Sequence, residues 1–302
     1  MTECTVLSAE KTAALLPIKP LCNEIAQAAE DYAQGLIQSP ERQVLGMNGA
    51  GLLLSMPATA ADVAIHKLVN VCPDNKQLGL PTIVGMVSVY DGKTGLPKLL
   101  LDGPTVTAMR TAAVSMLAIR QLSRDKRPHF AIFGSGKQAS AHLAAIAQLY
   151  PGAAVDMHGR ERETVTAFIA EHENLDLHLR VGSAQVADSV SVVITLTTSS
   201  TPVYSLAARS DRLLVGVGAF TAQMAEFSPL AVNGSQLYVD DPNGARHEAG
   251  DLIQAGVDWS QVQPLASALR GDIDFSRPIL FKSVGSAAWD LAAARCALKM
   301  AF

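Results

Sequence analysis

The sequence has little of what metal sites, disulfide frameworks and nucleic-acid surfaces require. Its 302 residues include four cysteines that lie far apart and form no C-x-x-C pair, so neither a zinc knuckle nor a disulfide framework is indicated. The seven histidines form no H-x-x-x-H or H-E-x-x-H motif, and we predict no metal site. The formal net charge is −4 and no basic cluster occurs, which argues against nucleic acid or an anionic membrane surface as a partner.

Long apolar runs and a targeting signal are also missing. The uncharged stretch 189–208 is rich in serine and threonine and contains Pro202, which is typical of a strand and loop rather than a membrane span. The N-terminus carries Glu3 and has no basic region before an apolar one, so no signal peptide is predicted. Apolar residues make up 49 % and charged residues 17 % of the chain, enough for a large core. We expect a soluble, cytoplasmic protein of two domains or one large α/β unit.

The most informative stretch is HFAIFGSGKQASAHLAAIA at 129–147. A short apolar segment ends in the turn Gly134-Ser135-Gly136, and a helical pattern follows. A strand, a glycine turn and a helix in this order form a site for a dinucleotide pyrophosphate, because the first glycine permits the turn and the second lets the backbone approach the phosphates. Ala139 fills the sixth position of G-x-G-x-x-G/A. Alone the motif is weak, since an ordinary strand-to-helix turn rich in small residues has the same pattern.

The segment before this motif predicts a mixed or antiparallel sheet preceded by helices. Ser8 can cap the first helix, and Pro17 ends it. The expected elements are helices over 9–16 and 21–37, strands over 42–45, 52–58 and 63–72, a two-stranded hairpin over 82–103 with its turn at 91–95, and a helix over 107–122.

From His129 the chain alternates between strands and helices, which is typical of a doubly wound parallel sheet. The expected strands cover 129–133, 153–157, 177–181, 190–196, 212–217 and 235–240, with helices over 137–149, 161–171, 183–188, 222–232 and 246–255, an irregular stretch to Pro278 and a final helix over 286–302. We therefore predict an α/β fold. A Rossmann-type domain over 124–278 is inserted into a mixed α+β domain formed by 1–123 and 279–302.

The tip after the second strand of the Rossmann domain carries cations. A domain that prefers NAD has Asp or Glu at this tip, but here the tip is HGRER at 158–162, and Asp156 lies two residues before it. Arg160 suits the 2′-phosphate of NADPH because its guanidinium can bind two phosphate oxygens. The alternative is that Arg160 and Arg162 only solvate the start of a helix, although the helix dipole disfavours cations there. We predict NADPH, with NADH as the alternative cofactor.

Two further cations occupy unusual places. Arg110 lies in the first turns of a helix, where an arginine and the helix N-terminus together form an anion site. An ion pair between Arg110 and Asp102 is an equal alternative by spacing. Lys67 interrupts the apolar strand pattern VAIHKLVNV, so its side chain either reaches solvent or points into a cleft. Arg42 and Thr82 are unremarkable by themselves.

Several longer stretches resemble the signature of the ornithine cyclodeaminase/μ-crystallin family. They are KLVNV at 67–71 with Pro73 and Asn75, GPTVTAMRTAA at 103–113, GSGKQA at 134–139, TTS at 197–199, VD at 239–240 with EAG at 248–250, and FKSVG at 281–285. They follow the family's order over nearly the whole chain. The resemblance implies a substrate-binding and dimerisation domain built from both chain ends, a Rossmann domain between them, and a homodimer formed through the first domain.

The resemblance also implies site residues. The family's two arginines and one lysine that hold the substrate carboxylate match Arg42, Lys67 and Arg110, and Lys67 and Arg110 are the candidate catalytic residues. Thr82 matches a threonine near the nicotinamide, and Arg110 is assigned to the cofactor as well. The other matches to dinucleotide contacts are Gly134, Ser135, Gly136, Lys137, Gln138, Gly159, Arg160, Glu161, Thr197, Val217, Gly218, Ala219, Phe220 and Ser283.

The sequence departs from the family at the catalytic acid. Ornithine cyclodeaminases and archaeal alanine dehydrogenases of this family carry an aspartate after Gly-Ala, whereas Phe220 follows Gly218-Ala219 here. Phenylalanine can neither accept a proton from an amine nor direct water onto an imine. The glutamate that cyclodeaminases carry near Met56-Pro57 is also missing, because Leu, Leu and Ser precede Met56. Cyclodeamination of ornithine is therefore disfavoured.

The remaining groups suit reduction of a cyclic imino acid. Arg42, Lys67 and Arg110 would hold the carboxylate of Δ1-pyrroline-2-carboxylate or Δ1-piperideine-2-carboxylate against the nicotinamide, giving L-proline or L-pipecolate. Phe220 either forms a wall for the apolar ring or is a core aromatic. The alternatives are an amino-acid dehydrogenase or an ornithine cyclodeaminase of the same family, a reductase of another imine such as one derived from opines, and a non-enzymatic μ-crystallin-like protein that binds NADPH or another ligand.

Overall fold

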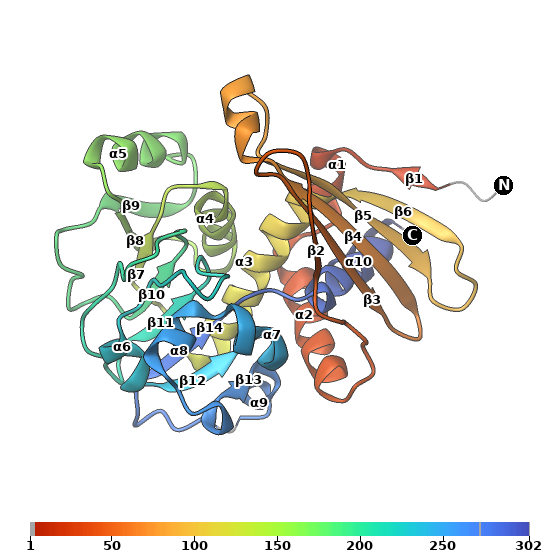
Figure 1. The fold of residues 1–302 in the computed structure, drawn as a ribbon. Coiled ribbons are helices and arrows are strands. Elements are labelled where there is room, and N and C mark those ends of the chain that lie inside the picture. The colour runs from red at the N-terminus through yellow and green to blue at the C-terminus, as the bar shows by residue number, and fades with distance from the viewer. Residues whose placement is uncertain (1–3, 272, 302) are drawn as a thin grey trace. The chain divides into compact units, whose positions relative to one another are not determined.

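A computed structural model describes residues 4–271 and 273–301. The chain forms two compact units (Figure 1). The first comprises the chain up to Ala113 together with the segment from Ser286, and the second comprises Val114–Gly285. The division falls inside helix α3 (Gly103–Leu122). The domain boundaries at 123/124 and 278/279 stay predictions.

The first unit is built on a six-stranded sheet in the order β1-β6-β5-β4-β3-β2. These strands are β1 (Thr5–Val6), β6 (Pro97–Asp102), β5 (Ile83–Asp91), β4 (Val63–Val71), β3 (Leu52–Thr59) and β2 (Gln43–Gly46). β1 pairs with β6 in parallel, and the other neighbours are antiparallel. The prediction of a mixed sheet is therefore confirmed.

Helices from both chain ends cover one face of this sheet. Helix α10 (Ala287–Ala301) packs on β3 and β4, and α2 (Ile18–Ala33) packs on α10. The other elements of this unit are α1 (Ala9–Ala14), the first part of α3 and the 3-10 helix η1 (Pro73–Leu78). In β4, Val63, Ile65, Lys67 and Val69 are buried and alternate with less buried residues, as expected of a strand that is covered on one face only.

The second unit is an eight-stranded sheet in the order β13-β12-β14-β11-β10-β7-β8-β9, with every pair parallel. Its strands are β7 (Phe130–Phe133), β8 (Ala153–His158), β9 (Leu177–Val181), β10 (Val192–Thr195), β11 (Leu213–Gly216), β12 (Gln236–Val239), β13 (Gln263–Pro264) and β14 (Ile279–Lys282). Its helices are α4 (Lys137–Leu149), α5 (Arg162–Glu171), α6 (Pro229–Asn233), α7 (Pro242–Glu248), α8 (Gly250–Ala255), α9 (Leu265–Leu269) and the 3-10 helix η2 (Trp259–Gln261). This confirms the predicted Rossmann-type fold.

Several predicted helix limits are wrong. Residues 183–188 form no helix. The helix expected over 222–232 is limited to α6, which begins at Pro229 because Ser228 caps it. The helix expected over 246–255 is divided at Ala249 into α7 and α8, and Asp241 caps α7. Residue 302 of the predicted last helix lies outside the described residues. No helix in the described ranges is long and apolar enough to cross a membrane.

Candidate active site

The glycine turn after β7 has the geometry that the motif predicts. Gly134 has φ +118°, and a Cβ there would lie 2.9 Å from the carbonyl oxygen of Leu196, so only glycine suits the position. Gly136 is the N-cap residue of α4, and no side chain caps this helix end. A Cβ on Gly136 would meet nothing within 4 Å. The N–H groups at the start of α4 can therefore receive an anion.

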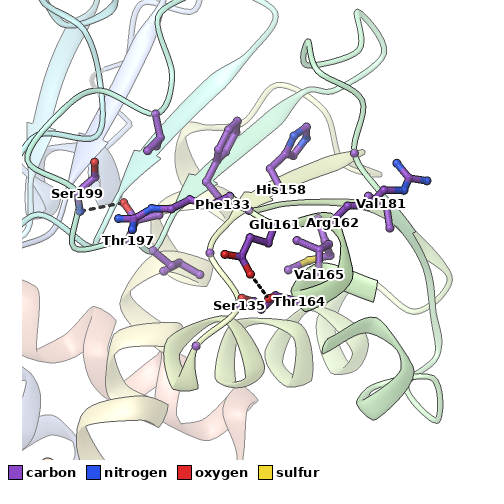
Figure 2. A pocket seen from close by; sticks show the side chains of 18 of the residues that line it. Phe133, Ser135, His158, Glu161, Arg162, Thr164, Val165, Val181, Thr197 and Ser199 are labelled. Carbon is purple, nitrogen blue, oxygen red and sulfur yellow. Dashed lines mark hydrogen bonds between the residues drawn. The ribbon is translucent and has the colours of Figure 1, made fainter. Parts of the chain in front are cut away.

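A cavity of about 850 Å³ opens at this turn (Figure 2). It lies where the strand order reverses, since β8 and β9 continue on one side of β7 and β10 lies on the other. Such a switch point is where open parallel sheets bind dinucleotides. The predicted residues among its lining are Gly134, Ser135, Gly136, Gly159, Arg160, Glu161 and Thr197. The position, the uncapped helix and the two lining arginines fit a dinucleotide.

The loop after β8 contributes two cations to the lining of the same cavity. Arg160 and Arg162 both line it, and Figure 2 shows Glu161 beside Thr164, whose hydroxyl donates to it at 3.4 Å. Asp156 is occupied elsewhere: Arg180 donates to its carboxylate, and His129 Nε2 lies 3.1 Å from it. Burial alone would raise the pKa of Asp156, but these partners bring it below the usual value. Asp156 is therefore a structural ion-pair residue.

Glu226 holds two loops at the carboxyl edge of the second sheet. Its buried carboxylate accepts hydrogen bonds from Thr197 N–H at 2.6 Å, the Thr197 hydroxyl at 2.9 Å, Gly218 N–H at 2.7 Å and Ala219 N–H at 3.0 Å. A Cβ on Gly218 would lie 2.0 Å from the Thr197 carbonyl oxygen, so the loops approach as closely as backbone allows. Glu226 thus fixes three residues that the family resemblance assigns to the cofactor.

Further buried carboxylates order the neighbouring loops. Asp251 accepts from the N–H groups of Glu226 and Phe227, and its other oxygen lies 2.9 Å from Lys282 Nζ. Asp240 accepts from the Ser283 hydroxyl at 2.7 Å and from the N–H of Val284 and Gly285. These bonds position Ser283 at the end of β14.

Lys67 and Arg110 meet at a buried acid in the first unit. Lys67 Nζ lies 3.0 Å from Asp290 Oδ1, and Arg110 Nε lies 3.4 Å from the same oxygen. Lys67 is 3 % and Arg110 7 % exposed. Burial lowers the pKa of Lys67 to about 8, Arg110 and Arg42 add to the decrease, and Asp290 opposes it. Arg42 is thus among the charges that act on Lys67, and its place beside the other two cations stays a prediction.

These contacts decide two alternatives. The ion pair between Arg110 and Asp102 is wrong, because Arg110 pairs with Asp290 and Asp102 accepts hydrogen bonds from the N–H and hydroxyl of Thr105. Lys67 does not reach solvent: the strand register places it between Met56 and Val87 on the face that α10 covers.

The remaining predicted residues are not among those that line the cavity. Lys137 and Gln138 begin α4, Val217, Gly218, Ala219 and Phe220 follow β11, and Ser283 follows β14. Thr82 precedes β5 and belongs with Arg110 to the first unit. Phe220 is 43 % exposed, so the alternative of a core aromatic is wrong. Its role as a ring wall stays a prediction.

Sequence patterns missed several residues. Arg162, Thr164, Ser183 and Ser199 line the cavity without having been assigned. Asp290 could have been found, because it is the only acidic residue in the apolar run SAAWDLAAARCAL. In residues 4–271 and 273–301, no group of three or more His, Cys, Asp or Glu side chains could hold a metal ion.

A family model extends over almost the whole chain. Residues 2–300 match the model of the ornithine cyclodeaminase/mu-crystallin family. The chain belongs to this family.

Curated relatives within the family include reductases of cyclic imino acids. The chain is 51 % identical to a Delta(1)-pyrroline-2-carboxylate/Delta(1)-piperideine-2-carboxylate reductase of Azospirillum brasilense, over 97 % of this chain and 94 % of the relative. It is 49 % identical to Delta(1)-pyrroline-2-carboxylate reductase 2 of Burkholderia ambifaria, over 98 % and 96 %.

Two solved structures have the same fold. The Thermococcus litoralis Delta(1)-pyrroline-2-carboxylate reductase, solved with NADH and L-proline, matches with a TM-score of 0.85 and 25 % identity, over 98 % of this chain and 97 % of that chain. An archaeal alanine dehydrogenase dimer with bound NAD also has a TM-score of 0.85, at 23 % identity over 99 % and 96 %, and supports the fold alone.

Proposed function

We propose that this member of the family reduces cyclic ketimines with NAD(P)H. The substrates are Δ1-pyrroline-2-carboxylate, Δ1-piperideine-2-carboxylate or both, and the products are L-proline and L-pipecolate. The observation that carries the proposal is the cluster of Lys67 and Arg110 on Asp290. Arg42 adds a further positive charge that acts on Lys67. Such a cluster suits a small carboxylate. The reductase relatives at about half identity support the substrate class.

The cations would bind and orient the substrate. Arg110 would donate charged hydrogen bonds to the substrate carboxylate, and Lys67 and Arg42 would add charge. Binding of the carboxylate holds the C=N carbon in one place. Such orientation can lower the activation barrier by up to about 7–11 kcal/mol in favourable cases. When bound, the nicotinamide supplies the hydride. We assign no proton donor, because a ring nitrogen that is already protonated needs none during the transfer.

Ornithine cyclodeamination is the weaker alternative. It needs a carboxylate to handle protons at the amine, and Phe220 stands in place of the family's aspartate. Phe220 is exposed enough to contact a ligand, and we propose that it forms an apolar wall for the ring.

The dinucleotide site favours NADPH within the same proposal. Arg160 and Arg162 line the cavity after β8, and Asp156 is held by Arg180 and His129. A 2′-phosphate would gain charged hydrogen bonds at this tip. NADH remains the alternative cofactor, since Glu161 also lines the cavity and could accept from a ribose hydroxyl. A cytoplasmic location belongs to the proposal because the reaction consumes a reduced nicotinamide cofactor.

A homodimer through the first unit completes the proposal. The face of its sheet opposite α10 carries apolar residues, among them Leu45, Leu68, Val84 and Met86. Leu45, Val84 and Met86 are exposed. Exposed apolar patches on sheets are typical of protein interfaces.

Purified protein tests the reaction directly. NADPH absorbance should fall when Δ1-pyrroline-2-carboxylate or Δ1-piperideine-2-carboxylate is added, and the product should be identified by chromatography. Ornithine, and pyruvate with ammonia, serve as comparison substrates. Turnover of ornithine without turnover of either ketimine refutes the proposal, and NADPH binding without any turnover favours a binding protein.

A further inference from the structure

Asp290 joins the two best-placed cations of the first unit. It lies in α10, is 0 % exposed, and uses one oxygen, Oδ1, to contact Lys67 on β4 and Arg110 on α3. One carboxylate oxygen therefore fixes side chains from two different elements. None of the sequence motifs assigns a role to this residue.

The cluster needs this negative charge. Lys67 and Arg110 are both nearly buried, and burying two neighbouring cations without an acid is strongly unfavourable. The charged groups that act on Lys67 are Asp290 on α10, Arg110 on α3 and Arg42 before β2. Its neighbours on β3 and β5 are uncharged. Asp290 is thus the acid that favours the charged form of Lys67.

Asp290 is placed to act through the cations rather than on a substrate. Its second oxygen, Oδ2, is buried, and among the described residues it has no hydrogen-bond partner. Arg110 Nε is likewise buried without one. A fully enclosed carboxylate is not available to a ligand, whereas Arg110 keeps 7 % of its surface exposed.

We propose that Asp290 is a positioning residue, whose carboxylate holds the Lys67 ammonium and the Arg110 guanidinium side by side and keeps Lys67 protonated before a substrate carboxylate binds. The inference rests on the proposed function, because the ligand of the cluster is the ring carboxylate. Asp290 would then set the pH range in which Lys67 and Arg110 bind anions.

The physical consequence is a pH-dependent anion affinity. The pKa of Lys67 is about 8 with Asp290 present, so the ammonium is charged at neutral pH and loses its proton as the pH rises through this value. Because Asp290 opposes the decrease, its removal lowers the pKa of Lys67 further. The cluster then loses a positive charge at a lower pH.

Binding of pyrrole-2-carboxylate tests this inference. This flat ring acid has no reducible C=N bond, and its affinity for the NADPH-bound protein can be measured by calorimetry from about pH 6 to about pH 9.5. Wild-type affinity should fall with a midpoint near 8. In Asp290→Asn the midpoint should lie lower by about one pH unit or more. An unchanged midpoint overturns the inference, even if affinity is lower at every pH.

Asp62→Asn is the matched control. Asp62 pairs with Arg295 on the same helix α10, away from Lys67, so its removal also breaks an ion pair to α10. The midpoint should not move in this variant. An equal movement in Asp62→Asn and Asp290→Asn would overturn a specific role for Asp290.

Stability measurements decide the inference if Asp290→Asn folds poorly. The variant leaves a charged lysine buried without its acid, so the added change Lys67→Met should restore the melting temperature. A rise in pH toward about 8 should also stabilise the single variant relative to wild type. In this range the folded variant releases the Lys67 proton, whereas its unfolded state and folded wild type keep it. Failure of Lys67→Met to restore stability overturns the inference. Wild-type protein that neither reduces a ketimine nor binds the probe contradicts the proposed function instead, and the stability comparison still decides Asp290.

Discussion

At the scale of single residues, Arg110 is buried against an acid but keeps a small part of its side chain at the surface. Its Nε faces Asp290, and the residue keeps 7 % of its surface exposed. An arginine held on one side by an acid presents its remaining donors in a fixed direction, which suits a planar carboxylate.

Replacement of Arg110 by alanine should weaken substrate binding strongly. A hydrogen bond to a charged group contributes about 1.5–3 kcal/mol, so KM for Δ1-pyrroline-2-carboxylate should rise about tenfold or more. Steady-state kinetics at saturating NADPH measure the change. The control is Arg120→Ala, at an exposed position of the same helix, which should keep the wild-type KM. Equal kinetics of Arg110→Ala and wild type would exclude Arg110 from the site.

The directions and partners of the charged side chains were only partly predictable from the sequence. The apolar pattern around Lys67 left two directions open, and the choice depends on α10, which comes more than 200 residues later and covers that face of the sheet. The spacing of Arg110 allowed a pair with Asp102, but Asp102 accepts from Thr105 at the start of α3. Local spacing cannot identify a partner that is brought in by a distant helix.

At the scale of elements, we propose that the connection from β8 to α5 selects the cofactor. Arg160, Glu161 and Arg162 all line the cavity there. Glu161 is the N-cap residue of α5, and no side chain caps this helix end.

Arg160→Ala should change cofactor preference more than catalysis. Loss of a phosphate contact should raise KM for NADPH about tenfold, with little change in KM for NADH, which has no 2′-phosphate. Kinetics with each cofactor at a saturating ketimine concentration measure the ratio. Arg127→Ala, an exposed arginine outside the cavity lining, is the control. A parallel loss with both cofactors would contradict recognition of the 2′-phosphate by Arg160.

The elements themselves were largely predictable where strands and helices alternate. The strands near 130, 192 and 213 follow from short apolar runs. The strand near 153 is mostly apolar, and the strand near 177 shows the alternation of apolar and polar residues. The error at 222–232 comes from a loop in which tertiary hydrogen bonds replace helical ones. There, Asp251 accepts from the N–H groups of Glu226 and Phe227, and this acid follows them by about 25 residues.

At the scale of the whole molecule, the proposed dimer rests on exposed apolar residues of the sheet face opposite α10. Met86 lies on β5 opposite Leu68 of β4, and it is 44 % exposed. A second copy of the chain on this face would remove apolar surface from water.

Met86→Lys should shift the protein from dimer to monomer. A buried, unpaired charge in an apolar interface is costly, and light scattering after size-exclusion chromatography measures the mass. Leu230→Lys, at an exposed position of α6, is the control and should leave the mass unchanged. A wild-type monomer, or a Met86→Lys dimer as stable as wild type, would contradict an interface on this face.

A structure of the protein with NADPH and pyrrole-2-carboxylate is the most direct test of the central claim. The carboxylate should lie within hydrogen-bond distance of Arg110, with the Lys67 ammonium next to it and the ring against the nicotinamide. A carboxylate bound elsewhere, with Lys67 and Arg110 contacting only Asp290, would contradict the account.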